Sequence, residues 1–188
     1  MNQNKFQLNH DPSSVNDDIV TIRIGHSPDP DDAFMFHALT NGAIDTGNRR
    51  YEHILVDIDT LNREAEIGNF EVSAVSIHSY PKISDSYYLM NCGASMGEGY
   101  GPILISKEEM SVEEASRSVI AIPGKSTSSY LALVLALGEV DVVEVPFDQI
   151  LPGVLDGKYD SGVIIHEGQL TWSDAVSYTH LRAHETTN

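Results

Sequence analysis

Short stretches of alternating hydrophobic and polar residues recur along this chain, and most are followed by runs with helical spacing. Ile22 and Ile24 alternate with polar neighbours, and Ile54, Val56 and Ile58 do the same further on. Alternation with a period of two is typical of a strand that buries one face. Both stretches are therefore expected to form strands.

A helix is expected to begin at Pro30, shortly after the first strand, which Gly25 lets the chain leave at an unusual angle. Proline suits the first helical position, where its missing N–H needs no partner, so Asp29 is the expected N-cap. Asp31 and Asp32 then fall in the first turn, where the helix dipole favours negative charge. The apolar stripe expected to face the core consists of Phe34, Met35, Ala38 and Leu39.

The second half of the chain alternates more regularly between strand and helix patterns. Ser111 and Glu114 have the spacing of a capping box, which predicts a short helix. This half is typical of a parallel sheet with right-handed crossovers. Its expected elements are strand 119–122, helix 126–137, strand 140–145, helix 147–155 and strand 162–165. The first half is expected to add a helix over 61–67, capped by Asp59 or Thr60, and strands over 71–76, 87–90 and 102–106.

Together these elements predict an α/β protein with two lobes and a cleft between them. The first lobe is expected over residues 19–109 and the second over 110–175, because the boundary falls in the stretch 107–110. Residues 1–18 are polar and are expected to form a disordered arm. Residues 176–188 are expected to be a non-native tail.

Composition narrows the class of partner. Among the 188 residues, 28 are Asp or Glu and 11 are Lys or Arg, which gives a net charge of -17 without a basic cluster. Nucleic acid and anionic membrane surfaces are therefore not expected partners, whereas a small molecule is. The longest apolar run, 130–137, is far shorter than the roughly 20 residues that span a bilayer. No signal peptide is evident, so the expected compartment is the cytoplasm.

A phosphate-loop interpretation of Gly124-Lys125-Ser126 fails on spacing. The earlier glycine of that motif would fall at position 119, which is Val119. What remains is a helix N-terminus rich in hydroxyl groups, where Ser126, Thr127, Ser128 and free backbone amides can hold a carboxylate or a sugar hydroxyl. Simple helix capping is the alternative interpretation.

His166 is the candidate general base. It follows a buried strand, and in open α/β sheets the carboxyl ends of parallel strands border the ligand crevice. Imidazole titrates near neutral pH and can take a proton from a substrate, and the adjacent Glu167 either tunes it or faces solvent. The alternative is a structural histidine held by hydrogen bonds. No metal site or cofactor is expected, because the other histidines and the single Cys92 share no ligand spacing.

Six motifs together resemble the menaquinone-biosynthesis proteins of the futalosine pathway, a family that includes 1,4-dihydroxy-6-naphthoate synthases, which this chain resembles most, and chorismate dehydratases. They run in family order from about Thr21 to Thr171. The motifs are the segments 25–36, 57–63, 97–102, 122–130, 150–152 and 164–167.

This resemblance implies a fold like that of the type II periplasmic binding proteins, with two lobes closing on a small ligand. It implies a cofactor-independent lyase that splits cyclic dehypoxanthine futalosine to 1,4-dihydroxy-6-naphthoate, with His166 as the general base. The side chains expected to contact the substrate are Ser27, Asp29, Asp31, Ser76, Gly101, Ser126, Thr127, Ser128 and Glu167.

The chain departs from the family pattern in two places. Family synthases usually have Cys and Asn where this chain has Asp29 and Asp31. Carboxylates there would repel a carboxylate-bearing substrate unless they point away or are neutralised. Two alternatives are therefore kept: a solute-binding or sensing protein that uses the same cleft without catalysis, and an enzyme like the chorismate dehydratases.

The second departure is the end of the chain. Family members continue beyond this point, and their later segment returns to complete the first lobe. Residues 177–185 instead resemble translated sequencing-adapter read-through, so the histidines within them are not expected to form a metal pair. The chain is expected to be an inactive fragment, truncated before it returns to the first lobe.

Overall fold

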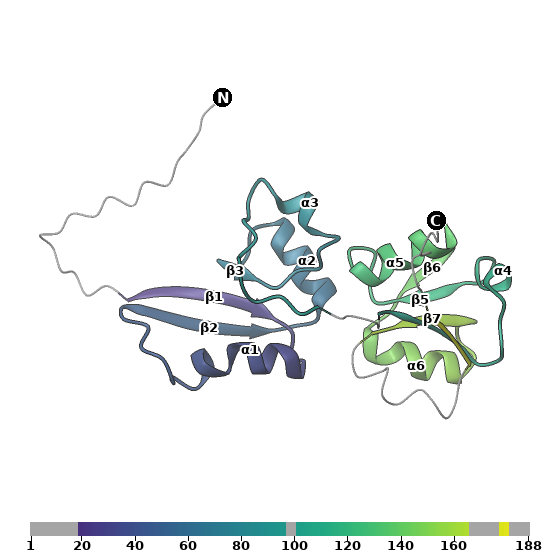
Figure 1. The fold of residues 1–188 in the computed structure, drawn as a ribbon, viewed down its shortest axis with the longest axis horizontal. Helices are drawn as coiled ribbons and strands as arrows, with labels where there is room; N and C mark the ends of the chain where they lie inside the picture. Colours follow the sequence, from purple (N-terminus) through teal and green to yellow (C-terminus); the bar gives the residue numbers. More distant parts are fainter. Residues whose placement is uncertain (1–18, 97–100, 166–176, 181–188) are drawn as a thin grey trace, which may run out of the picture.

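The computed structural model describes residues 19–96, 101–165 and, for the backbone only, 177–180. Its two β-sheets lie in two lobes, which stand side by side in Figure 1. Within the described ranges, no helix is long and apolar enough to cross a membrane. The predicted arm 1–18 falls outside these ranges.

The first lobe contains a three-stranded parallel sheet in the order β2-β1-β3. Helix α1 lies on one side of this sheet, and α2 and α3 lie on the other (Figure 1). The elements are β1 (Val20–His26), α1 (Pro30–Thr40), β2 (Arg49–Leu55), α2 (Ile58–Glu66), β3 (Val72–Ser73) and α3 (Tyr80–Ile83). The first predicted strand is confirmed, whereas the second ends at Leu55, so that Val56 lies outside it and Ile58 begins α2. The strand expected over 71–76 shortens to two residues, and none forms over 87–90.

Gly25 has a different role from the one expected. It lies inside β1, and a Cβ atom there would come within 2.7 Å of the Phe70 ring and 2.8 Å of the Leu61 side chain. Contacts that short force neighbouring atoms to move. Glycine is therefore required because α2 and the residues after it pack directly on the strand, and not because the chain turns there.

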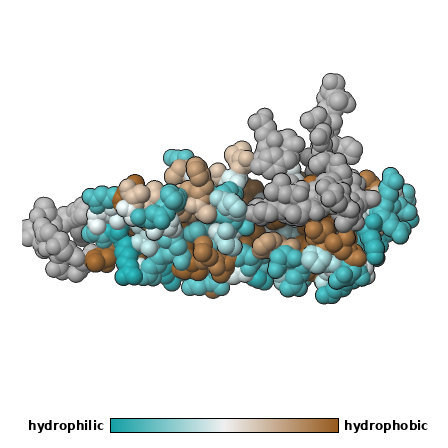
Figure 2. Space-filling view, turned by 90° about the horizontal axis from the view of Figure 1, so that it is seen from below, coloured by the Kyte–Doolittle hydropathy of each residue, from teal (hydrophilic) through white to brown (hydrophobic). Residues whose placement is uncertain are grey.

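Helix α1 begins at Pro30 with Asp29 as its N-cap residue, as predicted, but its apolar stripe differs. Phe34 was expected to face the core and is 87% exposed. Phe36 lies against the sheet instead, with its ring centroid 4.4 Å from that of His26. Figure 2 views the molecule from the side on which α1 and α6 lie and shows hydrophobic side chains on this face of the first lobe.

Helix α2 begins three residues earlier than predicted. Asp57, and not Asp59 or Thr60, is its N-cap, because the Asp57 carboxylate accepts hydrogen bonds from the Thr60 backbone N–H at 3.0 Å and from the Thr60 hydroxyl at 2.6 Å. Asp59 is thereby placed in the first turn, where it is buried. The turn that follows the second strand thus places two carboxylates close together.

The second lobe contains a mixed five-stranded sheet in the order β6-β5-β7-β4-β8. Strands β5, β6 and β7 are parallel, whereas β4 runs antiparallel to both of its neighbours, β7 and β8. The elements are β4 (Ile103–Ser106), α4 (Val112–Ala115), β5 (Ile120–Ile122), α5 (Ser128–Leu137), β6 (Val142–Glu144), α6 (Phe147–Leu155), β7 (Ser161–Ile164) and β8 (Ser177–His180). The predicted capping box of Ser111 and Glu114 is present at α4.

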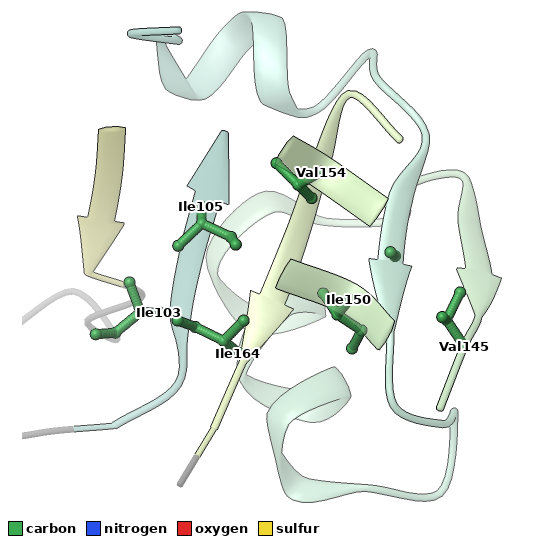
Figure 3. Packing of buried hydrophobic residues seen from close by; sticks show 7 residues of the cluster. Ile103, Ile105, Val145, Ile150, Val154 and Ile164 are labelled. Atoms are coloured by element: carbon green, nitrogen blue, oxygen red, sulfur yellow. The ribbon is translucent and has the colours of Figure 1, made fainter. Parts of the chain in front are cut away.

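Alternate residues of these strands supply two separate cores. Ile103, Ile105 and Ile164 face α6, where they meet Ile150 and Val154 in the cluster shown in Figure 3. The residues between them in sequence, such as those at positions 104 and 163, face α5 and α4 on the opposite side. The sheet is thus covered on both faces, which explains why its strands are hydrophobic throughout.

Strand β4 corrects the predicted division at 107–110. Residues 103–106 were assigned to the first lobe, yet they pair with β7 in the second sheet, from Ile103 opposite Ile164 to Ser106 opposite Ser161. The chain therefore enters the second lobe before residue 103. Pattern alone missed this because a short buried strand carries no sign of the sheet it joins. Residues 177–180 pair with β4 as well, and the non-native tail stays a prediction.

Candidate functional site

A cleft of about 370 Å³ lies where the start of α2 faces the second lobe. An adjoining narrower recess reaches the turn after β1 and is lined by Ser27 and Asp29, two of the residues expected to contact the substrate, and by Ile165. The other residues that line the cleft or the recess are Asp57, Ile58, Asp59, Arg63, Pro123, Glu144, Val145, Pro146, Phe147 and Asp148. The cleft is formed by both lobes.

The Ser27 turn is held by hydrogen bonds on every polar group of that residue. Its backbone N–H donates to the Asp32 carboxylate at 2.7 Å, and its carbonyl accepts from Nδ1 of His26 at 2.9 Å. Its hydroxyl accepts from the backbone N–H of Asp29 at 3.1 Å. Burial raises the pKa of the Asp32 carboxyl, and the bond from Ser27 offsets part of this effect. The turn is therefore a fixed wall of the cleft.

The start of α2 supplies two carboxylates with opposite pKa shifts. Burial alone would raise the pKa of Asp57, but the hydrogen bonds from Thr60 outweigh it and leave the pKa below its usual value. Burial raises the pKa of Asp59, and repulsion from Glu144 adds to the rise while Arg63, 3.1 Å away, opposes it. Asp57 therefore stays ionised, whereas Asp59 takes up a proton more readily.

Asn62 joins the two lobes. This residue of α2 has no exposed surface, and its side-chain oxygen accepts from the Ser76 backbone N–H at 2.8 Å. Its side-chain amide donates to the Ser76 hydroxyl at 3.1 Å and to the Ser126 carbonyl at 3.2 Å. Asn62 thus connects two residues that the sequence predicted to contact the substrate.

Two further contacts hold the segment before α5 against the first lobe. The Lys82 ammonium group donates to the Ser126 hydroxyl at 3.3 Å and lies 3.3 Å from the Glu66 carboxylate. Gly124 lies directly against Asp59, with no room for a Cβ atom between them. In this arrangement the carbonyl and the hydroxyl group of Ser126 are both bonded to the first lobe.

Helix α5 begins two residues later than predicted, which separates the three hydroxyl residues. Thr127 is the N-cap and is 2% exposed; its hydroxyl donates to the Gly124 carbonyl at 2.7 Å and accepts from the Tyr130 backbone N–H at 3.3 Å. Thr127 therefore has the capping role that was the alternative interpretation. Ser128 is the first helical residue and is half-buried, whereas Ser126 precedes the helix.

The remaining predicted contact residues are dispersed. Asp31 is exposed in the first turn of α1, and its carboxylate accepts from the Asp32 backbone N–H at 3.0 Å. Gly101 is half-buried shortly before β4. His166 and Glu167 lie outside the described residues. Ile165, the last described residue before them, lines the recess of the cleft.

Several cleft residues were missed by sequence reasoning. Asp57 was overlooked because Asp59 and Thr60 seemed equally good helix caps, although Asp57 also stands three residues before a backbone N–H that it could cap. Pro146 and Phe147 were treated only as the start of a helix. Asn62, beside the cleft, carries no local signal either, because its three hydrogen bonds go to Ser76 and Ser126, two residues distant in sequence.

The charge of the cleft restricts its ligand. Four carboxylates, those of Asp57, Asp59, Glu144 and Asp148, line the larger part together with one guanidinium group. A ligand carboxylate at that end would be repelled, whereas hydroxyl groups or a cationic group would be accepted. Among the described residues, no group of His, Cys, Asp and Glu side chains has the arrangement of a metal site.

Two α/β lobes that meet across a polar cleft define a protein of the solute-binding class of folds. The alkanesulfonate-binding protein SsuA of Xanthomonas axonopodis has this fold, with a TM-score of 0.64 at 12% identity over 90% of this chain and 62% of that one. Within this class the chain belongs to the menaquinone biosynthesis family, whose sequence profile matches residues 22–182.

Curated relatives and a solved structure agree with this assignment. The chain is 35% identical over 151 residues to a 1,4-dihydroxy-6-naphtoate synthase of Thermus thermophilus and 32% identical over 160 residues to that of Streptomyces coelicolor. These matches cover 80% and 82% of this chain but 54% and 56% of the relatives, so the chain spans about half their length. A crystal structure from Archaeoglobus fulgidus has a TM-score of 0.80 at 44% identity, covering 86% of this chain and 60% of that one.

Proposed function

We propose that the full-length protein is a carbon–carbon lyase of menaquinone biosynthesis that converts cyclic dehypoxanthine futalosine to 1,4-dihydroxy-6-naphthoate. The two relatives named as this synthase carry the proposal, since each matches about four fifths of the chain. A small-molecule ligand also agrees with the cleft, whose volume is about 370 Å³. No cofactor is required in this proposal.

His166 is the proposed general base. Strand β7 ends at Ile164, and Ile165 already lines the recess, so the chain reaches the cleft one residue before His166. A base must come within hydrogen-bonding reach of the proton that it removes, and the place of Ile165 in the recess supports this role for the residue that follows it. The pair Asp57 and Asp59 lines the same recess and can accept hydrogen bonds from ligand hydroxyl groups.

The proposed orientation of the substrate follows from charge. Its carboxylate would avoid the end lined by Glu144 and Asp148 and face the N-terminus of α5, where backbone amides and Ser128 can bind an anion. Asp29 lines the recess, so the hydroxyl-bearing part of the substrate is placed there. In this orientation the substrate carboxylate lies away from the acidic side chains, so an acidic cleft can bind an anionic substrate.

The test is turnover by the full-length protein and two histidine variants. His166→Ala is expected to lower the rate at least about 100-fold, because general bases contribute roughly that factor or more. His37→Ala is the matched control: His37 is exposed on α1, where its ring is hydrogen-bonded to the Asn41 side chain at the end of the same helix. Full turnover by the His166 variant would show that another group removes the proton.

A second candidate is a solute-binding or sensing protein without catalysis. The observation that favours it is the acidic cleft on a fold shared with an alkanesulfonate-binding protein. Calorimetric titration beside the turnover assay separates the two, since tight binding of an unrelated polyol or cation without product would reject the lyase. Chorismate is assayed as well, because its dehydration would indicate an enzyme like the chorismate dehydratases instead.

A further inference from the structure

Two histidines lie beneath the Ser27 turn, outside the residues that line the cleft. Nε2 of His26 in β1 lies 3.0 Å from Nδ1 of His53 in β2, and Phe36 of α1 packs against both rings. His26 is 3% exposed. Nε2 of His53 is also buried and has no hydrogen-bonding partner among the residues that the structure describes.

These contacts allow a single arrangement of protons on the neutral pair. Nδ1 of His26 must carry a proton, because its partner is the Ser27 carbonyl, which only accepts. Nε2 of neutral His26 is then an acceptor, so the proton between the rings belongs to Nδ1 of His53. Nε2 of His53 is left unprotonated, which suits a buried nitrogen without a partner.

An added proton has no suitable place. With both hydrogen bonds kept, the one free position is Nε2 of His53, where a charged N–H would be buried without an acceptor. The alternative is to break the bond between the rings or the bond to Ser27. Burial lowers the pKa of His53, and His26 lowers it further, in agreement with this argument.

The surrounding charges do not remove this restriction. From α1 the facing acid is Asp32, which burial leaves with a raised pKa and which already accepts from Ser27. His37, also on α1, is exposed and bonded to Asn41. On the strands, the charged pairs Arg23–Glu71 and Arg50–Glu52 stand at alternate positions, on the opposite face of the sheet from His53.

We propose that His26 and His53 form a neutral positioning pair that fixes the Ser27 turn for ligand binding, and that protonation of the pair releases this turn. The choice of ligand for detecting the release of the turn rests on the proposed function, whereas the inference about the histidine pair does not. Because burial lowers the pKa of His53 below its ordinary value of 6.5, ligand affinity should hold down to that pH and fall only below it. A loss of about tenfold is expected at one pH unit below this transition.

Two measurements on the full-length protein test the proposal. The first is the ¹⁵N NMR spectrum of its imidazole rings at pH 7.5, which should show His26 and His53 both protonated at Nδ1 and both unprotonated at Nε2. The second is calorimetric binding of cyclic dehypoxanthine futalosine from pH 7.5 down to about 4.5, carried out on the His166→Ala background so that turnover does not interfere.

The informative variant is His53→Asn, since the asparagine amide keeps a donor near the Nδ1 position but does not titrate. It should bind like the parent at pH 7.5 and lose the pH dependence, whereas the control His37→Asn should keep it. An unchanged tenfold loss in His53→Asn, or a protonated Nε2 of His53 at pH 7.5, would overturn the proposal. If the compound binds at no pH, the proposed substrate is wrong, and the ring spectrum still decides on the pair.

Discussion

Asp59 occupies the space that a side chain at Gly124 would need. A Cβ atom at Gly124 would overlap Oδ1 of Asp59, because the two would lie closer than unbonded atoms approach. The two residues belong to different lobes, so their contact sets how closely α2 approaches the segment before α5. A carboxylate that lines the cleft is thus also a spacer between the lobes.

Gly124→Ala should therefore force the lobes apart. The added methyl group meets the Asp59 carboxylate, and relief requires movement of α2 or of the 124–126 segment. We expect a larger radius of gyration in solution scattering and at least about tenfold weaker ligand binding, since small misplacements of a binding group cost that much or more. The double variant Asp59→Gly with Gly124→Ala removes the clash and should restore the radius. A normal radius in Gly124→Ala alone would contradict the spacer role.

Asn62→Ala should destabilise the protein and weaken the contact between the lobes. It leaves the Ser76 backbone N–H and the Ser126 carbonyl without their partner, and a buried unsatisfied group costs about 1–3 kcal/mol. The free energy of unfolding, measured by urea titration, should fall by that amount. Asn69→Ala is the control, because Asn69 is exposed just after the same helix and bonds Glu64.

Asn62→Asp separates the contribution of the bond to Ser126 from that of the bonds to Ser76. An aspartate keeps the acceptor for Ser76 but places a carboxylate oxygen opposite the Ser126 carbonyl. The lobes should then separate, as in Gly124→Ala, while the first lobe keeps the bond to Ser76. If Asn62→Asp bound ligand as well as the parent, the bond to Ser126 would not contribute to closure.

The pair Arg23 and Glu71 predicts the acid sensitivity of the first lobe. Hydrogen bonds from the Arg23 guanidinium group and backbone N–H lower the pKa of Glu71 to about 2. Because the folded pKa lies below the ordinary value of 4.5, the pair stabilises the fold above pH 4.5, and this stabilisation is lost as the pH falls toward 2.

Glu71→Gln should accordingly be less stable than the parent at pH 7. The difference in thermal midpoint between the two proteins should shrink as the pH is lowered from 4.5 toward 2. Glu113→Gln is a suitable control, since Glu113 of α4 in the second lobe makes a similar ion pair with Arg117, and both side chains are exposed. A difference that stays constant from pH 7 to pH 2 would mean that the charge of Glu71 is not what matters.

Local signals predicted much of the fold. Pro30 after Asp29 defined the start of α1, and the capping box of Ser111 and Glu114 defined α4, because each signal acts within one helical turn. Long-range relations were not accessible in this way. The antiparallel placement of Ile103–Ser106 depends on its pairing with β7, about 60 residues away, and on no feature of its own sequence.

The site, like the fold, was predictable only where a local signal in the sequence determines it. Ser27 and Asp29 follow a strand directly, and the structure places both in the recess. Thr127 had the right residue type for either binding or capping, and only its bonds to Gly124 and Tyr130 show that it caps. Asn62 would have required knowledge of three segments at once, although its complete burial makes it evident in the structure.

The bonds of Asn62 and Lys82 to Ser126 also determine how lobe opening should respond to conditions. These contacts are polar, so parting them would transfer little apolar surface to water. The heat-capacity change and the urea dependence of opening should then be small compared with those of unfolding. Opening should instead respond to ionic strength, because one of its contacts is made by an ammonium group. The degree of closure would thus vary with the salt around the protein while the two cores stay intact.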